Sequence, residues 1–270
     1  MIPGKMKKKT TADIIENNKI SDGIYSMRIK TDISRGIRPG QFVGIYTEDS
    51  SRILPRPISI CETDEDKKEL RLVYRISGKG TADIAAMKAG DKVHVLGILG
   101  NGYDLQCLKD KKNIVIMAGG IGIPPMLGLA KSIAAVVGED GDKKVTAVLG
   151  YRNSDTFLMK EFEKYCKVYV ATDDGSLGYK GNAIDAMREN KLSPDIIFAC
   201  GPLPMLRGVK VCAQSADIPA YISLEERMAC GVGACLGCVC KTVNKDSHSN
   251  VNNARICTDG PVFLAAEVDI

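Results

Sequence analysis

The stretch NIVIMAGGIGIPPMLGLA, residues 113–130, decides the fold class. It is uncharged and as long as a membrane-spanning segment. However, it contains four glycines and the pair Pro124 and Pro125, which would break a spanning helix. We therefore expect a buried strand over 113–119 that turns into a helix over 124–137, and no membrane span.

Strands and helices alternate along the sequence downstream of Lys112. Apolar runs predict strands over 144–152, 167–175, 194–202 and 219–226, and helical patterns occupy 155–165, 182–190 and 204–215. Strands of this kind, each followed by a helix, indicate a parallel sheet that helices cover on both faces. We expect an α/β nicotinamide-binding domain over residues 109–225.

The N-terminal part of the chain has the pattern of a small β-barrel. Runs rich in Ile, Val and Tyr, bounded by glycine, proline or charged turns, predict strands over 23–31, 41–48, 69–77 and 91–99. One helical pattern, 81–89, interrupts them. We expect an antiparallel barrel over residues 1–108.

Four of the ten cysteines lie close together in ERMACGVGACLGCVC, residues 226–240. Cys230, Cys235 and Cys238 have the spacing C-x4-C-x2-C, and Cys257 follows after a longer gap. This pattern is typical of a plant-type [2Fe–2S] cluster. Each iron takes two thiolates, and the glycines between the cysteines let backbone amides approach the cluster sulfurs. We expect a small iron–sulfur unit over residues 226–270.

Zinc is the main alternative for these thiols. Structural zinc sites usually contain two C-x2-C pairs, whereas this sequence has only the pair Cys235 and Cys238. Cys240 could replace Cys238, but we interpret it as a buried bystander because neighbouring strand residues face opposite ways. Cysteines without ligand spacing are interpreted as core residues; they are Cys61, Cys107, Cys166 and Cys212.

Three short motifs in the barrel half suit a flavin dinucleotide. They are RPIS (56–59), VYR (73–75) and GKGT (78–81). An arginine can pair with a pyrophosphate, and a serine hydroxyl can reach the flavin N5. GKGT precedes a helical pattern, so its backbone amides and its threonine hydroxyl can bind phosphate oxygens. RPIS alone is a weak signal, and the other two motifs support its interpretation.

Two glycine-bearing turns follow strands of the expected sheet. AGGIGIPPM (118–126) and ACGPLPM (199–205) each stand at a strand end before a helix. Ligands of open parallel sheets bind at the carboxyl ends of the strands, so these turns are expected to flank one crevice. A purely structural turn is the alternative for the first motif taken alone. The residues predicted to bind NAD are Gly119, Gly120, Gly122, Gly201 and Pro202.

The remaining features narrow the class of protein. The formal net charge is +4, and the basic run at residues 5–10 is too short for a nucleic-acid surface. No signal-peptide core follows the N-terminus, so a cytoplasmic location is expected, where clustered thiols bind metal or do redox chemistry. His94, within a strand, and His248, in a polar loop, have no catalytic context. Asp173 and Asp174 suit a ribose or solvent better than acid–base catalysis.

RPIS, GKGT, AGGIGIPPM and CGPLPM occur in the order found in the ferredoxin–NADP reductase superfamily, which residues 8–225 resemble. That resemblance implies an FAD-binding barrel followed by a nicotinamide-binding domain. The segments LEERMACGVGACLGCVC (224–240) and ICTDGPVF (256–263) narrow it further. With them, nearly the whole chain resembles the electron-transfer subunits of the dihydroorotate dehydrogenase B family.

The resemblance implies roles for single residues. FAD contacts would fall on Arg56, Pro57, Ile58, Ser59, Val73, Tyr74, Arg75, Gly80 and Thr81, and cluster ligands on Cys230, Cys235, Cys238 and Cys257. Ser59 is expected near the flavin N5. Cys200 matches a superfamily cysteine near the nicotinamide, and an inert packing role for it stays open. Ile58 stands where many plant-type reductases carry an aromatic, so another group must stack on the flavin.

These cofactors together predict electron transfer. NAD exchanges hydride, a [2Fe–2S] cluster exchanges single electrons, and a flavin connects the two because it does both. The sequence shows no site for an oxidisable substrate, so a partner must supply one. The resemblance implies an FMN-containing catalytic subunit that oxidises dihydroorotate to orotate for pyrimidine biosynthesis, in a heterotetramer of two copies of each chain. Electrons would pass through the cluster and FAD to NAD⁺. Arg152, which follows the second parallel strand, is the one arginine that could bind the 2′-phosphate of NADP.

Two other functions stay open at this point. One is an iron–sulfur flavoprotein NAD(P)H reductase that serves a sulfide- or ferredoxin-linked partner, although such enzymes often depart from four cysteine ligands. The other is a non-catalytic binding module that zinc stabilises. A colourless protein would favour the zinc module.

Overall fold

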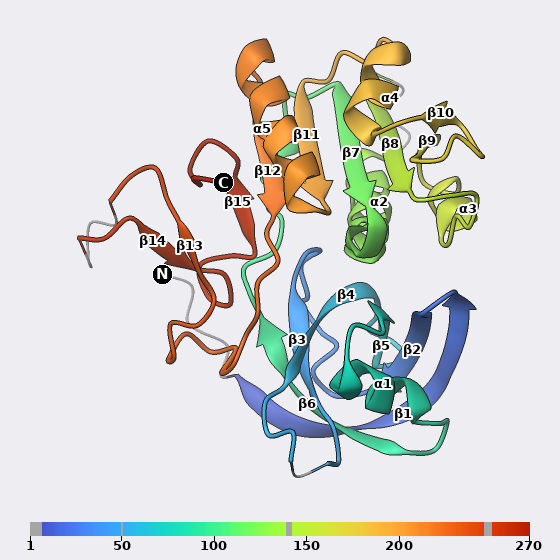
Figure 1. Ribbon diagram of the computed structural model, residues 1–270, viewed down its shortest axis with the longest axis vertical. Coiled ribbons are helices and arrows are strands. Elements are labelled where there is room, and N and C mark those ends of the chain that lie inside the picture. The colour runs from blue at the N-terminus through green and yellow to red at the C-terminus, as the bar shows by residue number, and fades with distance from the viewer. Residues whose placement is uncertain (1–6, 50, 139–141, 246–249) are drawn as a thin grey trace.

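The computed structural model describes residues 7–49, 51–138, 142–245 and 250–270. The chain forms a closed barrel, a seven-stranded sheet with flanking helices, and a small C-terminal unit (Figure 1). The sheet domain lies above the barrel in that view, and the C-terminal unit lies beside both. The predicted fold class, a β-barrel followed by an α/β domain and a small terminal unit, is confirmed.

The barrel contains six antiparallel strands in the order β1–β2–β5–β4–β3–β6. The strands are β1 Lys8–Ser21, β2 Ile24–Lys30, β3 Phe42–Tyr46, β4 Arg56–Asp64, β5 Glu69–Arg75 and β6 Lys92–Leu99, and helix α1 spans Lys79–Ala86. Alternate residues point inward, so that Leu70, Leu72 and Tyr74 of β5 share the barrel core.

Strand β1 has no counterpart among the predicted strands. Its sequence, KKTTADIIENNKIS, is rich in residues with low strand propensity. Nevertheless, it pairs with β2 along one edge and with β6 along the other, and Ala12 and Ile14 are buried in the barrel core. Pairing on both edges therefore supplies what the local sequence lacks.

The sheet of the α/β domain has the order β10–β9–β8–β7–β11–β12–β15, in which all strands but β15 run parallel. The strands are β7 Asn113–Gly119, β8 Lys144–Tyr151, β9 Lys167–Thr172, β10 Tyr179–Lys180, β11 Ile196–Cys200, β12 Ala220–Ser223 and β15 Val262–Leu264. The helices are η1 Leu105–Leu108, η2 Gly120–Gly122, α2 Ile123–Val137, α3 Met159–Phe162, α4 Ala183–Glu189 and α5 Leu203–Ala216.

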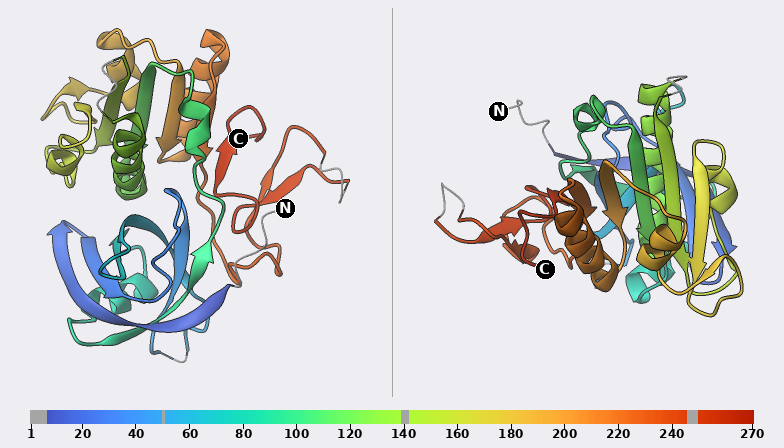
Figure 2. Two further views of the ribbon diagram at one scale, coloured as in Figure 1. Left: turned by 180° about the vertical axis from the view of Figure 1, so that it is seen from behind. Right: turned by 90° about the horizontal axis from the view of Figure 1, so that it is seen from above.

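Helices cover both faces of this sheet, as predicted (Figure 2). Ile114 and Ile116 of β7 pack in the cluster that contains α2, whereas Val115 and Met117 pack in the cluster that contains α4 and α5. Helix α2 belongs to the one stretch in the described chain, Gly120–Val137, that is long and apolar enough to cross a membrane. Its side chains from Ile123 to Leu127 are buried, so here it is a core helix.

The helix predicted over 155–165 is wrong in length. Only Met159–Phe162 forms a helix, because an Asx turn comes before it, in which the Asp155 amide donates to Asn153 Oδ1 at 3.0 Å. Leu158 then adopts a left-handed conformation with φ +63° and places its side chain in the core. Local side-chain bonding and burial thus override the helical pattern.

The C-terminal unit is joined to the sheet domain rather than separate from it. Its hairpin consists of β13 Val239–Lys241 and β14 Asn253–Arg255. The final strand, β15, pairs antiparallel with β12 and so extends the sheet. The C-terminal segment therefore contributes both a cysteine loop and an edge strand.

Candidate functional site

The predicted phosphate-binding residues of the barrel meet at the start of α1. Arg56 begins β4, and its guanidinium lies against Gly80 so closely that a methyl group there would collide with it. Thr81 Oγ1 accepts hydrogen bonds from the Ser77 and Gly78 amides at 2.8 and 3.2 Å, which winds the GKGT turn tightly. A cationic side chain thus stands over exposed backbone at a helix start, an arrangement suited to a pyrophosphate.

The other predicted flavin residues divide between the two faces of the barrel wall. Ile58 and Tyr74 pack in the barrel core, and the Tyr74 hydroxyl donates to Asn17 Oδ1 at 2.9 Å. Pro57 and Arg75 are exposed, Ser59 is half-buried, and Val73 packs in the apolar cluster around α2. The side chains of Ile58 and Tyr74 therefore point into the barrel, whereas Ser59 lies on the outer face of the wall.

The two glycine-bearing turns of the sheet domain meet at the carboxyl ends of β7 and β11. Gly122 packs against the backbone of Cys200 and Gly201, where any side chain would collide with it. Gly120 has φ +54° and open space above its Cα. The two turns therefore lie side by side at the strand ends, and the backbone at Gly120 has open space beside it.

Cys200 is the last residue of β11, next to these turns, and its environment makes it unreactive. Burial raises the pKa of its thiol to about 12, although a hydrogen bond with Ser223 acts in the opposite direction. The thiol is therefore protonated at neutral pH. This favours packing and positioning over nucleophilic chemistry.

Among the described residues, neither His94 nor the acidic pair Asp173 and Asp174 forms a catalytic group. His94 is exposed on β6, with Nδ1 3.2 Å from Thr11 Oγ1, and His248 lies outside the described residues. The Asp174 carboxylate accepts hydrogen bonds from the Ser176 hydroxyl and amide at 2.6 and 2.9 Å, and these bonds lower its pKa. Asp173 is exposed beside it.

The four predicted cluster ligands come together in the C-terminal unit. The Cys235 thiol shifts the pKa of Cys230, and the Cys238 thiol shifts the pKa of Cys257, so the members of each pair lie close together. Two pairs of thiols are a grouping that suits two irons. No three His, Cys, Asp or Glu side chains in the described part of the chain converge on one point.

Backbone amides surround the first thiol pair. The amides of Val232, Ala234 and Cys235 donate to Cys230 Sγ at 3.4, 3.3 and 3.4 Å, and the Gly237 amide donates to Cys235 Sγ at 3.4 Å. Burial acts to raise the pKa of Cys230, but these amides outweigh it and lower the pKa to about 6. The loop therefore favours the thiolate, which is the form that binds iron.

The segment that carries Cys257 is tied to this loop. Arg255 pairs with Asp259, with 3.1 Å between Nε and Oδ2, and its Nη1 donates to the Gly233 carbonyl at 3.4 Å. Burial raises the pKa of Cys257 to about 11. Cys240 is half-buried on β13, where burial also raises its pKa.

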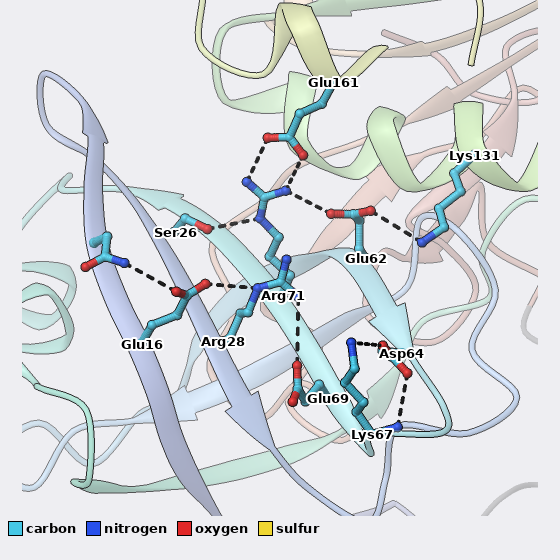
Figure 3. Close-up of polar contacts among 11 residues, drawn as sticks. Glu16, Ser26, Arg28, Glu62, Asp64, Lys67, Glu69, Arg71, Lys131 and Glu161 are labelled. Carbon is cyan, nitrogen blue, oxygen red and sulfur yellow. Dashed lines mark hydrogen bonds and ion pairs between the residues drawn. The ribbon is translucent and has the colours of Figure 1, made fainter. Parts of the chain in front are cut away.

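A buried arginine, which the sequence analysis did not identify, joins the barrel to the sheet domain (Figure 3). Arg71 of β5 is 8% exposed and forms a bidentate pair with Glu161 of α3, at 2.6 and 3.0 Å. Its Nη1 also donates to Glu62 of β4 at 2.8 Å, and Lys131 of α2 lies 3.6 Å from Glu62. Both carboxylates and both cations thus bridge the two domains. The sequence signal for Arg71 is its position in LRLVYR: it stands between two leucines that face the barrel core, so it lies on the outer face of β5.

Helix α2 approaches the barrel at a glycine. Gly128 lies against the Cys61 carbonyl of β4, and a methyl group there would collide with that oxygen. Cys61 is buried, as predicted. The close contact holds the barrel wall next to the helix that follows the first glycine turn.

Comparisons with known proteins agree with this architecture. Residues 225–269 match the family described as iron–sulfur cluster binding domain of dihydroorotate dehydrogenase B, and residues 116–211 match an oxidoreductase NAD-binding domain. The chain is 42% identical to the dihydroorotate dehydrogenase B (NAD⁺) electron transfer subunit of Fusobacterium nucleatum, covering 94% of this chain and 96% of that one. It is 38% identical to the subunit of the same name from Listeria innocua, covering 97% and 99%.

Solved structures share the fold. An NADH-dependent reduced ferredoxin–NADP oxidoreductase, studied for flavin-based electron bifurcation, superposes with a TM-score of 0.83 at 27% identity and covers 99% of this chain and 91% of that chain. A ferredoxin NADP⁺ reductase from Neisseria gonorrhoeae with bound FAD and NADP superposes with a TM-score of 0.65 at 17% identity, covering 82% and 94%.

Proposed function

Because the chain belongs to the family of dihydroorotate dehydrogenase B (NAD⁺) electron transfer subunits, we propose that it carries electrons from a catalytic partner to NAD⁺. The partner is an FMN-containing subunit that oxidises dihydroorotate to orotate in pyrimidine biosynthesis. The observation that carries the proposal is the four-thiol cradle on the same chain as the two meeting glycine turns.

Three sets of residues hold the three cofactors in this proposal. The barrel residues Arg56, Pro57, Ile58, Ser59, Val73, Tyr74, Arg75, Gly80 and Thr81 bind FAD, and the sheet residues Gly119, Gly120, Gly122, Gly201 and Pro202 bind NAD. The cluster ligands are Cys230, Cys235, Cys238 and Cys257. Tyr74 and Ile58 contribute backbone rather than side chain, since their side chains belong to the barrel core. When bound, the flavin links hydride transfer to single-electron transfer.

The chain's own groups position these cofactors and exclude water. Arg56 provides a charge-assisted contact for the flavin pyrophosphate, and Ser59 offers a hydroxyl to the flavin N5. Backbone at Gly120 receives the phosphates of NAD. The protonated Cys200 thiol, held by Ser223, fills space beside the nicotinamide without reacting.

The cluster loop supplies the surface for the partner. Cys235 is exposed, and the neighbouring Val232 and Leu236 are 38% and 63% exposed. Apolar side chains around an exposed ligand suit a contact that brings a second redox group close to the cluster. We place the FMN-containing subunit on this loop, in a heterotetramer of two copies of each chain. The ten free thiols are consistent with a cytoplasmic location.

The test is to isolate the complex from its own cells under anaerobic conditions and to supply dihydroorotate and NAD⁺. We expect NADH to form, and its formation to depend on a second, FMN-bearing chain. In the Cys235→Ser variant the visible and EPR signals of the cluster should disappear while FAD stays bound, and NADH formation should stop. Cys212→Ser, a partly buried cysteine on α5 outside the cradle, is the matched control and should behave as the wild type.

Two outcomes would contradict the proposal. A yellow-brown complex that oxidises NADH with dyes but does not oxidise dihydroorotate would contradict the partner assignment. It would favour a reductase such as the bifurcating enzyme with the same fold. An intact cluster in Cys235→Ser would overturn the ligand assignment.

A further inference from the structure

The segment LGNGY, residues 99–103, contacts all three units of the molecule. The segment starts at the last residue of β6. The Tyr103 amide donates to the Pro39 carbonyl of the barrel domain at 2.7 Å. The Tyr103 hydroxyl donates to the Ala199 carbonyl of β11 at 3.1 Å, next to the two glycine turns. Leu99, Gly100 and Asn101 contact the C-terminal unit, so this short stretch is a junction.

Both polar atoms of the Asn101 side chain form hydrogen bonds to the C-terminal unit. Its Nδ2 donates to the carbonyls of Asp259 and Val262 at 2.9 and 2.8 Å, and its Oδ1 accepts from the Val262 amide at 3.2 Å. Its backbone amide donates to the Gly260 carbonyl at 2.7 Å. These four bonds anchor the segment directly after the ligand Cys257.

The residues next to Asn101 contact the cradle from the same side. Gly100 lies against the Pro261 ring, and a Cβ atom at this position would be only 3.1 Å from the Gly260 carbonyl oxygen. Leu99 Cδ1 lies 3.2 Å from the Cβ position of Gly231, which follows the ligand Cys230. Both chain segments that supply thiols are therefore held by one three-residue stretch of the barrel.

The same stretch is connected to the flavin face through the strand register. Leu99 of β6 is opposite Phe42 of β3, and Phe42 is opposite Ser59 of β4. With neighbouring strands about 4.8 Å apart, Ser59 and Leu99 are separated by about 10 Å. Phe42 and Leu99 share one apolar cluster with Cys238 and Cys257, so the space between flavin face and cradle is packed.

We propose that Asn101 is a positioning residue that sets the spacing between the cluster and the flavin, and with it the rate of electron transfer between them. The inference rests on the proposed function, since it needs both cofactors on this chain. With both cofactors bound, NADH would supply two electrons as a hydride to the flavin; the cluster would take one of them, and the other would stay on the flavin. Electron transfer falls steeply with distance, so a loosened anchor slows this step and leaves hydride transfer unchanged.

The test compares two rates in the full chain with its cofactors bound. The wild type and Asn101→Ala are mixed anaerobically with NADH; stopped-flow absorbance follows flavin reduction, and freeze-quench EPR follows cluster reduction. In Asn101→Ala we expect cluster reduction to slow by about tenfold, with flavin reduction unchanged, because small displacements of reacting groups cost large factors in rate. Asn101→Ser, whose hydroxyl keeps one donor and one acceptor on a shorter side chain, should lie between the two.

Asn18→Ala is the matched control, because Asn18 is an exposed asparagine of β1 whose side chain, among the described residues, donates to the nearby Glu16. It should leave both rates as in the wild type. If Asn101→Ala melts at a lower temperature but reduces its cluster at the wild-type rate, Asn101 is only a structural anchor and the inference is wrong. If Asn101→Ala loses its cluster, the milder Asn101→Ser decides in the same way. A wild type that never reduces its cluster with NADH would instead contradict the proposed function.

Discussion

At the scale of single residues, the site depends on glycines at which a side chain would collide with a neighbouring group. Gly80 leaves room for the Arg56 guanidinium, and Gly122 leaves room for the Cys200 carbonyl. In the cluster loop, three backbone amides donate to Cys230 Sγ. Phosphates and cluster sulfurs are acceptors that backbone N–H groups satisfy, so small residues at these turns suit the binding that we propose for them.

Gly80→Ala should weaken FAD binding. The added methyl group collides with the Arg56 guanidinium and displaces it from the start of α1. We expect about tenfold weaker binding, equivalent to about 1.4 kcal/mol, measured by fluorescence titration of the apoprotein with FAD. Gly78→Ala is the control, because Gly78 has extended backbone and no atom within 4 Å of its Cβ position. Equal FAD affinity in the two variants would disprove the contact.

At the scale of elements, helix α2 connects the nicotinamide turn to the barrel. It begins directly after Gly122, and its side chains from Ile123 to Leu127 are buried. One turn later it meets β4 at Gly128. Because one rigid helix makes both contacts, its approach to β4 determines how the nicotinamide turn faces the flavin motif on that same strand.

Gly128→Ala should destabilise the protein even though alanine favours helices. Its methyl group meets the Cys61 carbonyl, which is backbone and cannot rotate away. We expect a loss of about 2 kcal/mol in the free energy of unfolding, measured by urea denaturation. Gly208→Ala in α5 is the control: its methyl group meets only the end of the Ile184 side chain, so a gain of up to about 1 kcal/mol is expected. Equal effects would show that the helix–strand contact is not tight.

At the scale of the whole molecule, three units are held together by a few long-range contacts. The Arg71 network joins the barrel to the sheet domain, and Asn101 joins the barrel to the cluster unit. Strand β15 joins the cluster unit to the sheet domain. Electron transfer needs fixed spacing between three cofactors, and these contacts each fix one pair of units.

Arg71→Ala should lower the free energy of unfolding by about 3 kcal/mol, because it leaves the partly buried Glu62 and Glu161 without their shared cation. Urea denaturation measures this loss, and the KM for NADH should rise as the domains lose their fixed angle. Arg28→Ala removes a more exposed pair with Glu16 and should cost less than about 1 kcal/mol. Losses of similar size in both variants would mean that Arg71 is not an interdomain clamp.

The sequence by itself determined the fold class, the grouping of three cysteines in one loop and the two glycine turns. Each of these is encoded within one contiguous stretch: a run of apolar residues, a loop with C-x4-C-x2-C spacing, or a turn after a strand. Signals of this kind can be recognised before the chain folds, because neighbouring residues alone define them.

Only the tertiary structure decided how these parts are held relative to one another. Asn101 and Val262 are 161 residues apart in the chain, and Arg71 and Glu161 are 90 apart. Strand β1, a polar segment, is a strand only because β2 and β6 pair with it. A local pattern carries no information about a partner that folding brings from elsewhere, so the residues that fix the spacing of the cofactor sites become visible only in three dimensions.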